Sequence, residues 1–169
     1  FRMFAMVSQI SQFIKNNAMV LLLVLLFALS GVVIVRNAWI CDDAYISYRV
    51  VDNFVNGHGL RWNIAERVQT FTHPLWFFLL SAVYFVTREI FYTSLFCSIA
   101  FSLLAIGLIV FRIAKTYQNG LIVGILLICS KSFVDYSTSG LENPLTFAIL
   151  AVFFAVFLNR RSDQKKLFV

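Results

Sequence analysis

Residues 41–76 read CDDAYISYRVVDNFVNGHGLRWNIAERVQTFTHPLW and form the only long polar segment of the chain. Long apolar runs lie on both sides of this segment. It holds two adjacent carboxylates, Asp42 and Asp43, together with both histidines, His58 and His73. This concentration of ionisable groups between apolar runs predicts that the rest of the chain is arranged around it.

The composition indicates an integral membrane protein. The chain is 60% hydrophobic and 13% charged, with a mean hydropathy of +0.84, which lies outside the soluble globular range. The net charge of +6 does not indicate a nucleic-acid partner, because the basic residues fall between apolar runs and there set the orientation in a membrane. Three cysteines, two of them inside apolar runs, give no disulfide framework.

The segment before the polar stretch predicts one membrane crossing. Residues 16–35 form an uncharged run bracketed by Lys15 and Arg36, and about 20 residues are enough to cross a bilayer. No small-residue cleavage site follows it, so we expect a retained helix rather than a signal sequence. Residues 1–15 alternate loosely between apolar and polar, and we expect an interfacial helix there.

Within the polar stretch, residues 44–56 place apolar and polar side chains on opposite helical faces, which predicts an amphipathic surface helix. Gly57 is well placed to end it in a left-handed conformation. Residues 60–72 predict an irregular or hairpin segment. Residues 74–86 are apolar but about 13 long, which is typical of a re-entrant or surface helix, and Pro74 suits the first turn.

Downstream runs predict three more crossings, at 91–112, 119–137 and 143–159. If residues 74–86 stay on the outer surface, the basic groups near both chain ends and at residues 112–115 all lie inside. We therefore expect an all-α polytopic membrane protein with about four transmembrane helices, counting 16–36, and an outer loop at 37–90. The chain begins on Phe1 and has no visible internal repeat, and we expect a fragment of a larger multispanning protein.

The carboxylates admit two interpretations. Asp42 and Asp43 follow the outer end of the first crossing, where one could cap the next helix. The alternative is a general base that takes the proton of an attacking hydroxyl, with partial burial and the neighbouring carboxylate raising its basicity. Asp43 adjoins the expected helix start, which favours Asp43 as the cap and Asp42 as the base if one of the two acts as a base.

The cations of the polar stretch also admit two interpretations. They can extend to lipid headgroups, or as a set they can hold a phosphate. Glu142 could be an acidic residue stabilised by the dipole at a helix N-terminus, or it could be a second carboxylate of the site. We assign no metal ligands and no definite cofactor; carboxylate oxygens would suit a divalent cation, but no spacing is diagnostic. The phosphate-binding set is Arg49, His58, Arg61, Arg67 and His73.

The polar stretch, followed by STSGLENPL at residues 137–145, resembles the beginning of a GT-C glycosyltransferase. The resemblance covers about residues 18–158 and is nearest to the bacterial arabinofuranosyl- and mannosyltransferase-like branch. It implies that residues 1–169 are the N-terminal part of a GT-C-like transmembrane domain. Such enzymes move sugar from a polyprenyl-phosphate carrier, and the resemblance implies inversion at the transferred sugar.

The resemblance also implies site roles and a location. Asp42 or Asp43 would be the catalytic base, and the donor or acceptor site would be lined by Arg49, His58, Arg67, His73 and Glu142. The partners would be the lipid-linked donor, a glycan, lipid or protein acceptor, and the bilayer, in a bacterial cytoplasmic membrane with the site facing outward. The alternative function is part of a transporter or flippase, in which Lys131 and Asp135 would mark a substrate path. The sequence does not identify the sugar or the acceptor.

Overall fold

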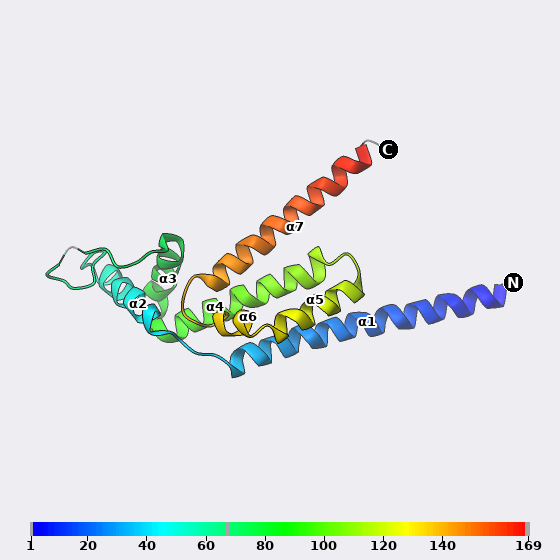
Figure 1. Ribbon diagram of the computed structural model, residues 1–169, viewed down its shortest axis with the longest axis horizontal. Helices are drawn as coiled ribbons and strands as arrows, with labels where there is room; N and C mark the ends of the chain where they lie inside the picture. The colour runs from blue at the N-terminus through cyan, green and yellow to red at the C-terminus, as the bar shows by residue number, and fades with distance from the viewer. Residues whose placement is uncertain (1, 67, 168–169) are drawn as a thin grey trace.

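The computed structural model describes residues 2–66 and 68–167, and this part of the chain is helical without strands. The expected all-α class is confirmed there. Helix labels follow Figure 1. The elements are α1 (Arg2–Arg36), α2 (Asp42–Val55), α3 (Pro74–Thr87), α4 (Ile90–Leu108), the π-helical turn η1 (Ile109–Ile113), α5 (Tyr117–Cys129), α6 (Lys131–Tyr136) and α7 (Asn143–Leu167).

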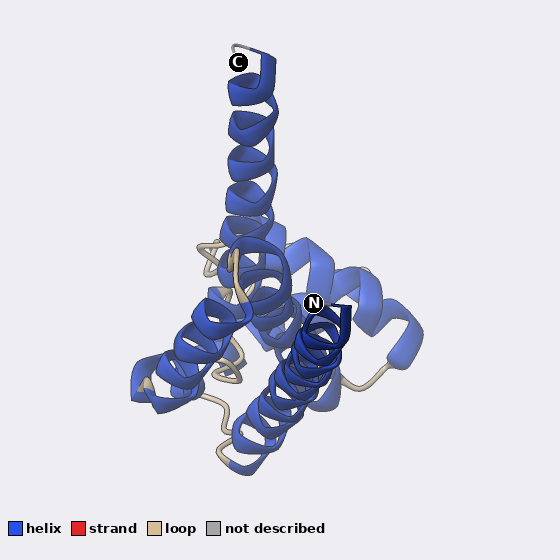
Figure 2. Cartoon of the chain, turned by 90° about the vertical axis from the view of Figure 1, so that its right-hand side faces the viewer, coloured by secondary structure: helices blue, strands red, loops and turns tan. Residues whose placement is uncertain are grey.

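The long helices run lengthwise, and the short helices α2 and α3 lie together at one end (Figure 1). Seen from the side where the N-terminus faces the viewer, the described residues are drawn as helices joined by loops (Figure 2). In the described residues α4 packs most extensively against α7 and also contacts α1 and α3, while α5 lies along α1. The loop at residues 137–142 lies at the same end as α2 and α3; we call this the loop end. The turn at residues 112–117 lies at the other end, toward which both termini point; we call this the basic end.

Two helical segments are long and apolar enough to cross a membrane, Asn17–Arg36 and Ile90–Ile113. Together with the composition they indicate a membrane protein. Three apolar helices are shorter: Pro74–Thr87, Tyr117–Cys129 and Asn143–Asn159. The structure thus supports two of the four expected crossings by length, and the four-crossing arrangement stays a prediction.

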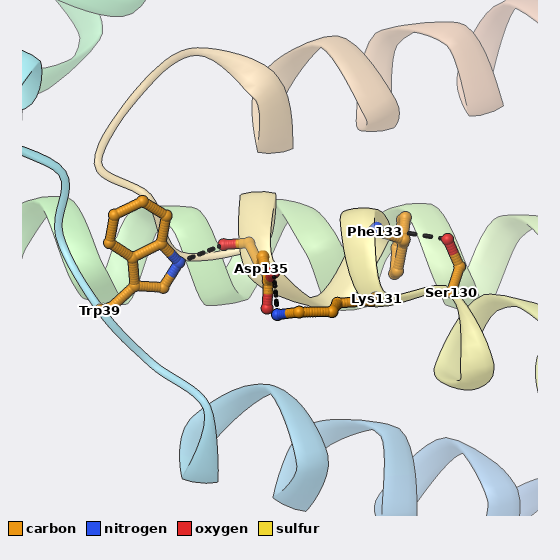
Figure 3. A network of polar contacts seen from close by, with 5 residues as sticks. All are labelled: Trp39, Ser130, Lys131, Phe133 and Asp135. Carbon is orange, nitrogen blue, oxygen red and sulfur yellow. Dashed lines mark hydrogen bonds and ion pairs between the residues drawn. The ribbon is translucent and has the colours of Figure 1, made fainter.

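The expected single helix at 119–137 is wrong, because the structure divides it at Ser130 into α5 and α6. Ser130 has extended backbone angles, φ −77° and ψ 102°. Its Oγ accepts a hydrogen bond from the Phe133 N–H and so caps the new helix (Figure 3). Serine competes with the helical backbone for hydrogen bonds, which suits it to a helix start rather than a helix interior.

The expected separation of residues 1–15 from the first crossing is also wrong, since α1 is one continuous helix from Arg2 to Arg36. Other local expectations are confirmed. Helix α2 has buried apolar residues along one face, Gly57 has φ +84°, and Pro74 lies in the first turn of α3. These features depend on neighbours along the chain, which is why the sequence predicted them.

The loop end has its own hydrophobic core, which fixes α2 on α3 and both on α4. Tyr48, Val51 and Leu80 are 3%, 0% and 0% exposed within it. Phe71 stacks on Phe77, with ring centroids 4.4 Å apart, and so anchors the end of the irregular segment on α3. The loop end is therefore a packed unit that can hold side chains in fixed positions.

Candidate functional site

The loop at residues 137–142 is the centre of the loop end. Ser137, Thr138 and Ser139 are all fully buried. The backbone N–H of Trp39 donates to Thr138 Oγ1 at 3.2 Å, and the Cys41 N–H donates to the Ser139 carbonyl at 3.0 Å. These bonds attach the loop to the linker between α1 and α2.

Gly140 allows the loop to approach α2 closely. The indole Nε1–H of Trp76 on α3 donates to the Gly140 carbonyl at 3.0 Å. Gly140 has φ +83°, and a Cβ there would lie 2.4 Å from the Tyr48 hydroxyl and 2.7 Å from the Ala44 Cβ. Both its backbone conformation and its surroundings therefore require glycine, and the close approach fixes the position of Glu142 two residues later.

A cavity of about 340 Å³ opens beside this loop, between α2, α3 and the end of the irregular segment. Asp43, His73 and Glu142 line it from three separate segments. His73 Nε2 lies 2.9 Å from Glu142 Oε1, with the His73 side chain 52% exposed and that of Glu142 24% exposed. The structure therefore brings together three of the eight residues that were proposed for the site from the sequence.

Hydroxyl groups and aromatic rings complete the cavity. Ser47, Thr70 and Thr72 line it, and Thr70 Oγ1 is buried with no hydrogen-bond partner in the structure. Such an unpartnered buried hydroxyl is uncommon, and it can donate to a bound molecule. Trp76 and Phe77 provide an apolar wall. The sequence analysis missed the three hydroxyl residues, because they share no periodicity and two of them lie in the irregular segment.

The two aspartates occupy different environments. Both side chains are exposed, but only Asp43 lines the cavity, while Asp42 Oδ1 accepts a hydrogen bond from the Asp43 N–H at 3.1 Å. The expectation that Asp43 caps α2 is wrong. Cys41 holds the N-cap position without a side-chain hydrogen bond, and both aspartates lie in the first helical turn. There, negative charge is favoured by the partial positive charge of the helix N-terminus.

The proposed phosphate-binding cations do not gather at the cavity. Arg49 lies over the Trp62 ring at 4.7 Å and donates to Asn63 Oδ1 at 3.1 Å, and Arg61 donates to the Ile64 carbonyl. His58 is exposed just after α2. Arg67 lies outside the described residues. Of the cations named from the sequence, only His73 lines the cavity among those described.

Two buried tyrosines hold α2 in place. The Tyr48 hydroxyl donates to Ser94 Oγ on α4 at 2.5 Å, and burial raises the Tyr48 pKa while this bond acts in the opposite direction. The Tyr84 hydroxyl on α3 donates to Asp52 Oδ1, and this bond raises the Tyr84 pKa. The helix that carries Asp43 is therefore attached to both of its neighbours.

A second polar network lies where α6 meets the linker (Figure 3). Lys131 Nζ lies 2.6 Å from Asp135 Oδ2, so the two residues form an ion pair across one helical turn. The Trp39 indole donates to the Asp135 carbonyl at 2.9 Å. The Lys131 side chain is 86% exposed, so its charge is not buried in the protein. No group of three or more His, Cys, Asp or Glu residues suited to a metal occurs in the described part of the chain.

Comparison with known proteins gives one significant relative. The chain is 29% identical over 128 residues to the terminal β-(1→2)-arabinofuranosyltransferase of Mycobacterium tuberculosis. The alignment covers 69% of this chain and 20% of the relative, so the chain spans about a fifth of that protein's length. No family model and no solved structure matches the chain. At a coarse level the similarity supports a glycosyltransferase.

Proposed function

We propose that this chain is the N-terminal part of a GT-C membrane glycosyltransferase, with Asp43 as the general base. The observation that carries the proposal is the convergence of Asp43, His73 and Glu142 on one cavity at the loop end. The similarity to an arabinofuranosyltransferase supports a sugar-transfer reaction. Asp43 is proposed in place of Asp42, since Asp43 lines the cavity and Asp42 does not.

In the proposed reaction the cavity receives the acceptor. Asp43 takes the proton of the acceptor hydroxyl as its oxygen bonds to the anomeric carbon of the donor sugar. The bond from that carbon to the phosphate oxygen breaks, the configuration inverts, and polyprenyl phosphate leaves with the electron pair. The two carboxylates would repel a phosphate, so the donor phosphate would bind outside this cavity. Glu142 Oε1 lies 2.9 Å from His73 Nε2 and would keep the His73 ring in place.

The proposed topology puts the loop end on the extracytoplasmic face. Helices α1, α4, α5 with α6, and α7 would cross the membrane, while α2 and α3 lie at its outer surface. The Arg112–Lys115 pair would then lie on the cytoplasmic side, as the positive-inside rule requires. The donor would be a polyprenyl-phosphate sugar and the acceptor a glycan, lipid or protein.

One observation favours the alternative, a transporter or flippase. Helix breaks inside a membrane are typical of transporter binding sites, and α5 breaks from α6 at Ser130. However, the freed groups at this break are already bonded: the Ser130 N–H donates to the Leu126 carbonyl and its Oγ accepts from Phe133. The break therefore offers fewer free polar groups than the cavity, and we prefer the transferase.

The test is a matched pair of substitutions in the full-length protein, reconstituted with a polyprenyl-phosphate sugar. Asp43→Asn keeps the side-chain size but cannot accept the proton, so turnover should fall by about 10²–10⁴-fold while donor lipid still binds. Asp42→Asn, which alters the neighbouring carboxylate, should cost less than about tenfold. Near wild-type turnover by Asp43→Asn would overturn the proposed base, and coupled substrate movement without sugar transfer would favour the transporter.

A further inference from the structure

The basic end contains two apolar grooves that meet at one lysine. The larger groove has a volume of about 670 Å³ and lies between the η1 region and α7, with Ile113, Val156 and Ala155 in its walls. The smaller, of about 400 Å³, lies between η1 and α5. Ile113 and Lys115 line both grooves, so the turn after η1 forms a ridge between them.

The charge at this ridge is positive without local compensation. Arg112 and Lys115 are exposed, and neither forms a hydrogen bond or ion pair with another described side chain. By contrast, Arg49, Arg61 and Arg88 at the loop end each have a partner. No Asp or Glu occurs between residues 90 and 134. The N-terminus of α5 begins at Tyr117, and its partial positive charge adds to the same region.

The backbone at this point is specialised. Residues Ile109–Ile113 form a π-helical turn, a feature that often occurs at functional sites because it redirects side chains. Gly120 allows α5 to approach the turn: a Cβ there would lie 3.0 Å from the Val110 carbonyl oxygen. In this arrangement α5 packs against η1 while Arg112 and Lys115 remain on the surface.

We propose that the basic end binds an anionic diacyl phospholipid. Its phosphate would lie between Arg112 and Lys115, and its two acyl chains would occupy the two apolar grooves. A diacyl lipid has one phosphate and two chains, which matches two apolar grooves that share one lysine. A free phosphate would satisfy the charges but leave both grooves unfilled. This site lies at the opposite end from the cavity and does not depend on the transferase assignment.

The test measures lipid binding to the full-length protein in a neutral detergent. Dioleoyl phosphatidylglycerol and dioleoyl phosphatidylcholine, which share their acyl chains, are titrated separately, and the bound lipid is counted by native mass spectrometry. We expect phosphatidylglycerol to bind more tightly. The double variant R112Q/K115Q should weaken its binding by about 30-fold, because each basic side chain near an anionic lipid contributes a factor of about five.

Two controls separate charge from shape. The variant R36Q/R88Q removes the same charge from the loop end and should leave phosphatidylglycerol binding unchanged. Ala155→Phe fills the larger groove and should weaken binding with both charges intact, whereas Ala100→Phe, on an exposed surface of α4, should not. Equal affinity for the two lipids, or unchanged binding in R112Q/K115Q, would overturn the proposal. Displacement of lipid by millimolar inorganic phosphate, with no effect of Ala155→Phe, would instead indicate a free-anion site.

Discussion

The two ends of the molecule handle polar groups in opposite ways. At the loop end, residues 137–140 are buried and bonded to Trp39, Cys41 and Trp76. At the basic end, Arg112 and Lys115 are exposed and have no described partner. Internal hydrogen bonds fix side-chain positions, as a reaction site requires, whereas unpaired surface charges respond to the surrounding lipid. The difference suggests chemistry at one end and membrane attachment at the other.

The contrast between the two ends requires that they face opposite sides of the membrane. Cysteine labelling tests this, and each position should be either labelled or not labelled from outside. In a full-length background lacking native cysteines, single cysteines replace Ile64, Arg88 or Gln118, all of which are exposed. A membrane-impermeant maleimide should label positions 64 and 88 on intact cells, and position 118 only after permeabilisation.

Positions 64 and 88 flank α3, so their equal accessibility would show that α3 does not cross. Labelling of position 118 from outside would require the topology to be redrawn. Residues 139 and 140 are unsuitable as probes because both are buried.

The next largest effect is a loss of stability when a glycine of the loop end is replaced by alanine, which tests how rigidly this end is packed. Gly140→Ala should destabilise the full-length protein by about 3 kcal/mol, because overpacking adds to the cost of a left-handed residue. Gly57→Ala is the matched control. It has φ +84° but no atom within 4 Å of the added Cβ, so only about 1 kcal/mol is expected.

Denaturation monitored by tryptophan fluorescence measures both variants, and Gly140→Ala should also lower transferase turnover. Equal losses for the two glycines would mean that the contact of the loop with Tyr48 and Ala44 does not hold it in place.

The smallest expected loss of stability comes from breaking the hydrogen bond between Tyr48 on α2 and Ser94 on α4. The Tyr48 pKa is raised in the folded protein, so the folded state holds this proton more tightly than the unfolded state does. The associated stability is fully present below about pH 10, the ordinary range of tyrosine, and is lost as pH rises above it. Tyr48→Phe should lower the free energy of unfolding by about 1 kcal/mol at neutral pH, because the hydrogen bond to Ser94 is lost. Between about pH 10 and 11 the stability of this variant should fall less than that of the unmodified protein.

Tyr45→Phe is the control, since Tyr45 is 52% exposed and its ring contacts that of Tyr48. Its alkaline profile should match that of the unmodified protein. A Tyr48→Phe profile identical to that of the unmodified protein would show that another group controls alkaline unfolding.

The sequence by itself determined the features that depend on near neighbours. Composition and run length predicted an all-helical membrane protein, because a bilayer requires internally bonded apolar segments. Side-chain period predicted the amphipathic α2, and Pro74 and Gly57 marked helix ends through their own backbone preferences. The same reasoning identified Asp43, His73 and Glu142 as candidates, and it favoured Asp42 as the base where we now propose Asp43.

Only the tertiary structure decided which candidates meet. Trp39 bonds to Thr138, 99 positions along the chain, and this contact helps to set Glu142 beside His73. The orientation of Asp43 into the cavity, and the unpartnered hydroxyl of Thr70, likewise depend on how α2 and α3 pack around the loop. Such contacts join segments that share no local pattern, because they arise from burial of side chains between distant helices. That is why the sequence could name candidate residues but not select the three that line the cavity.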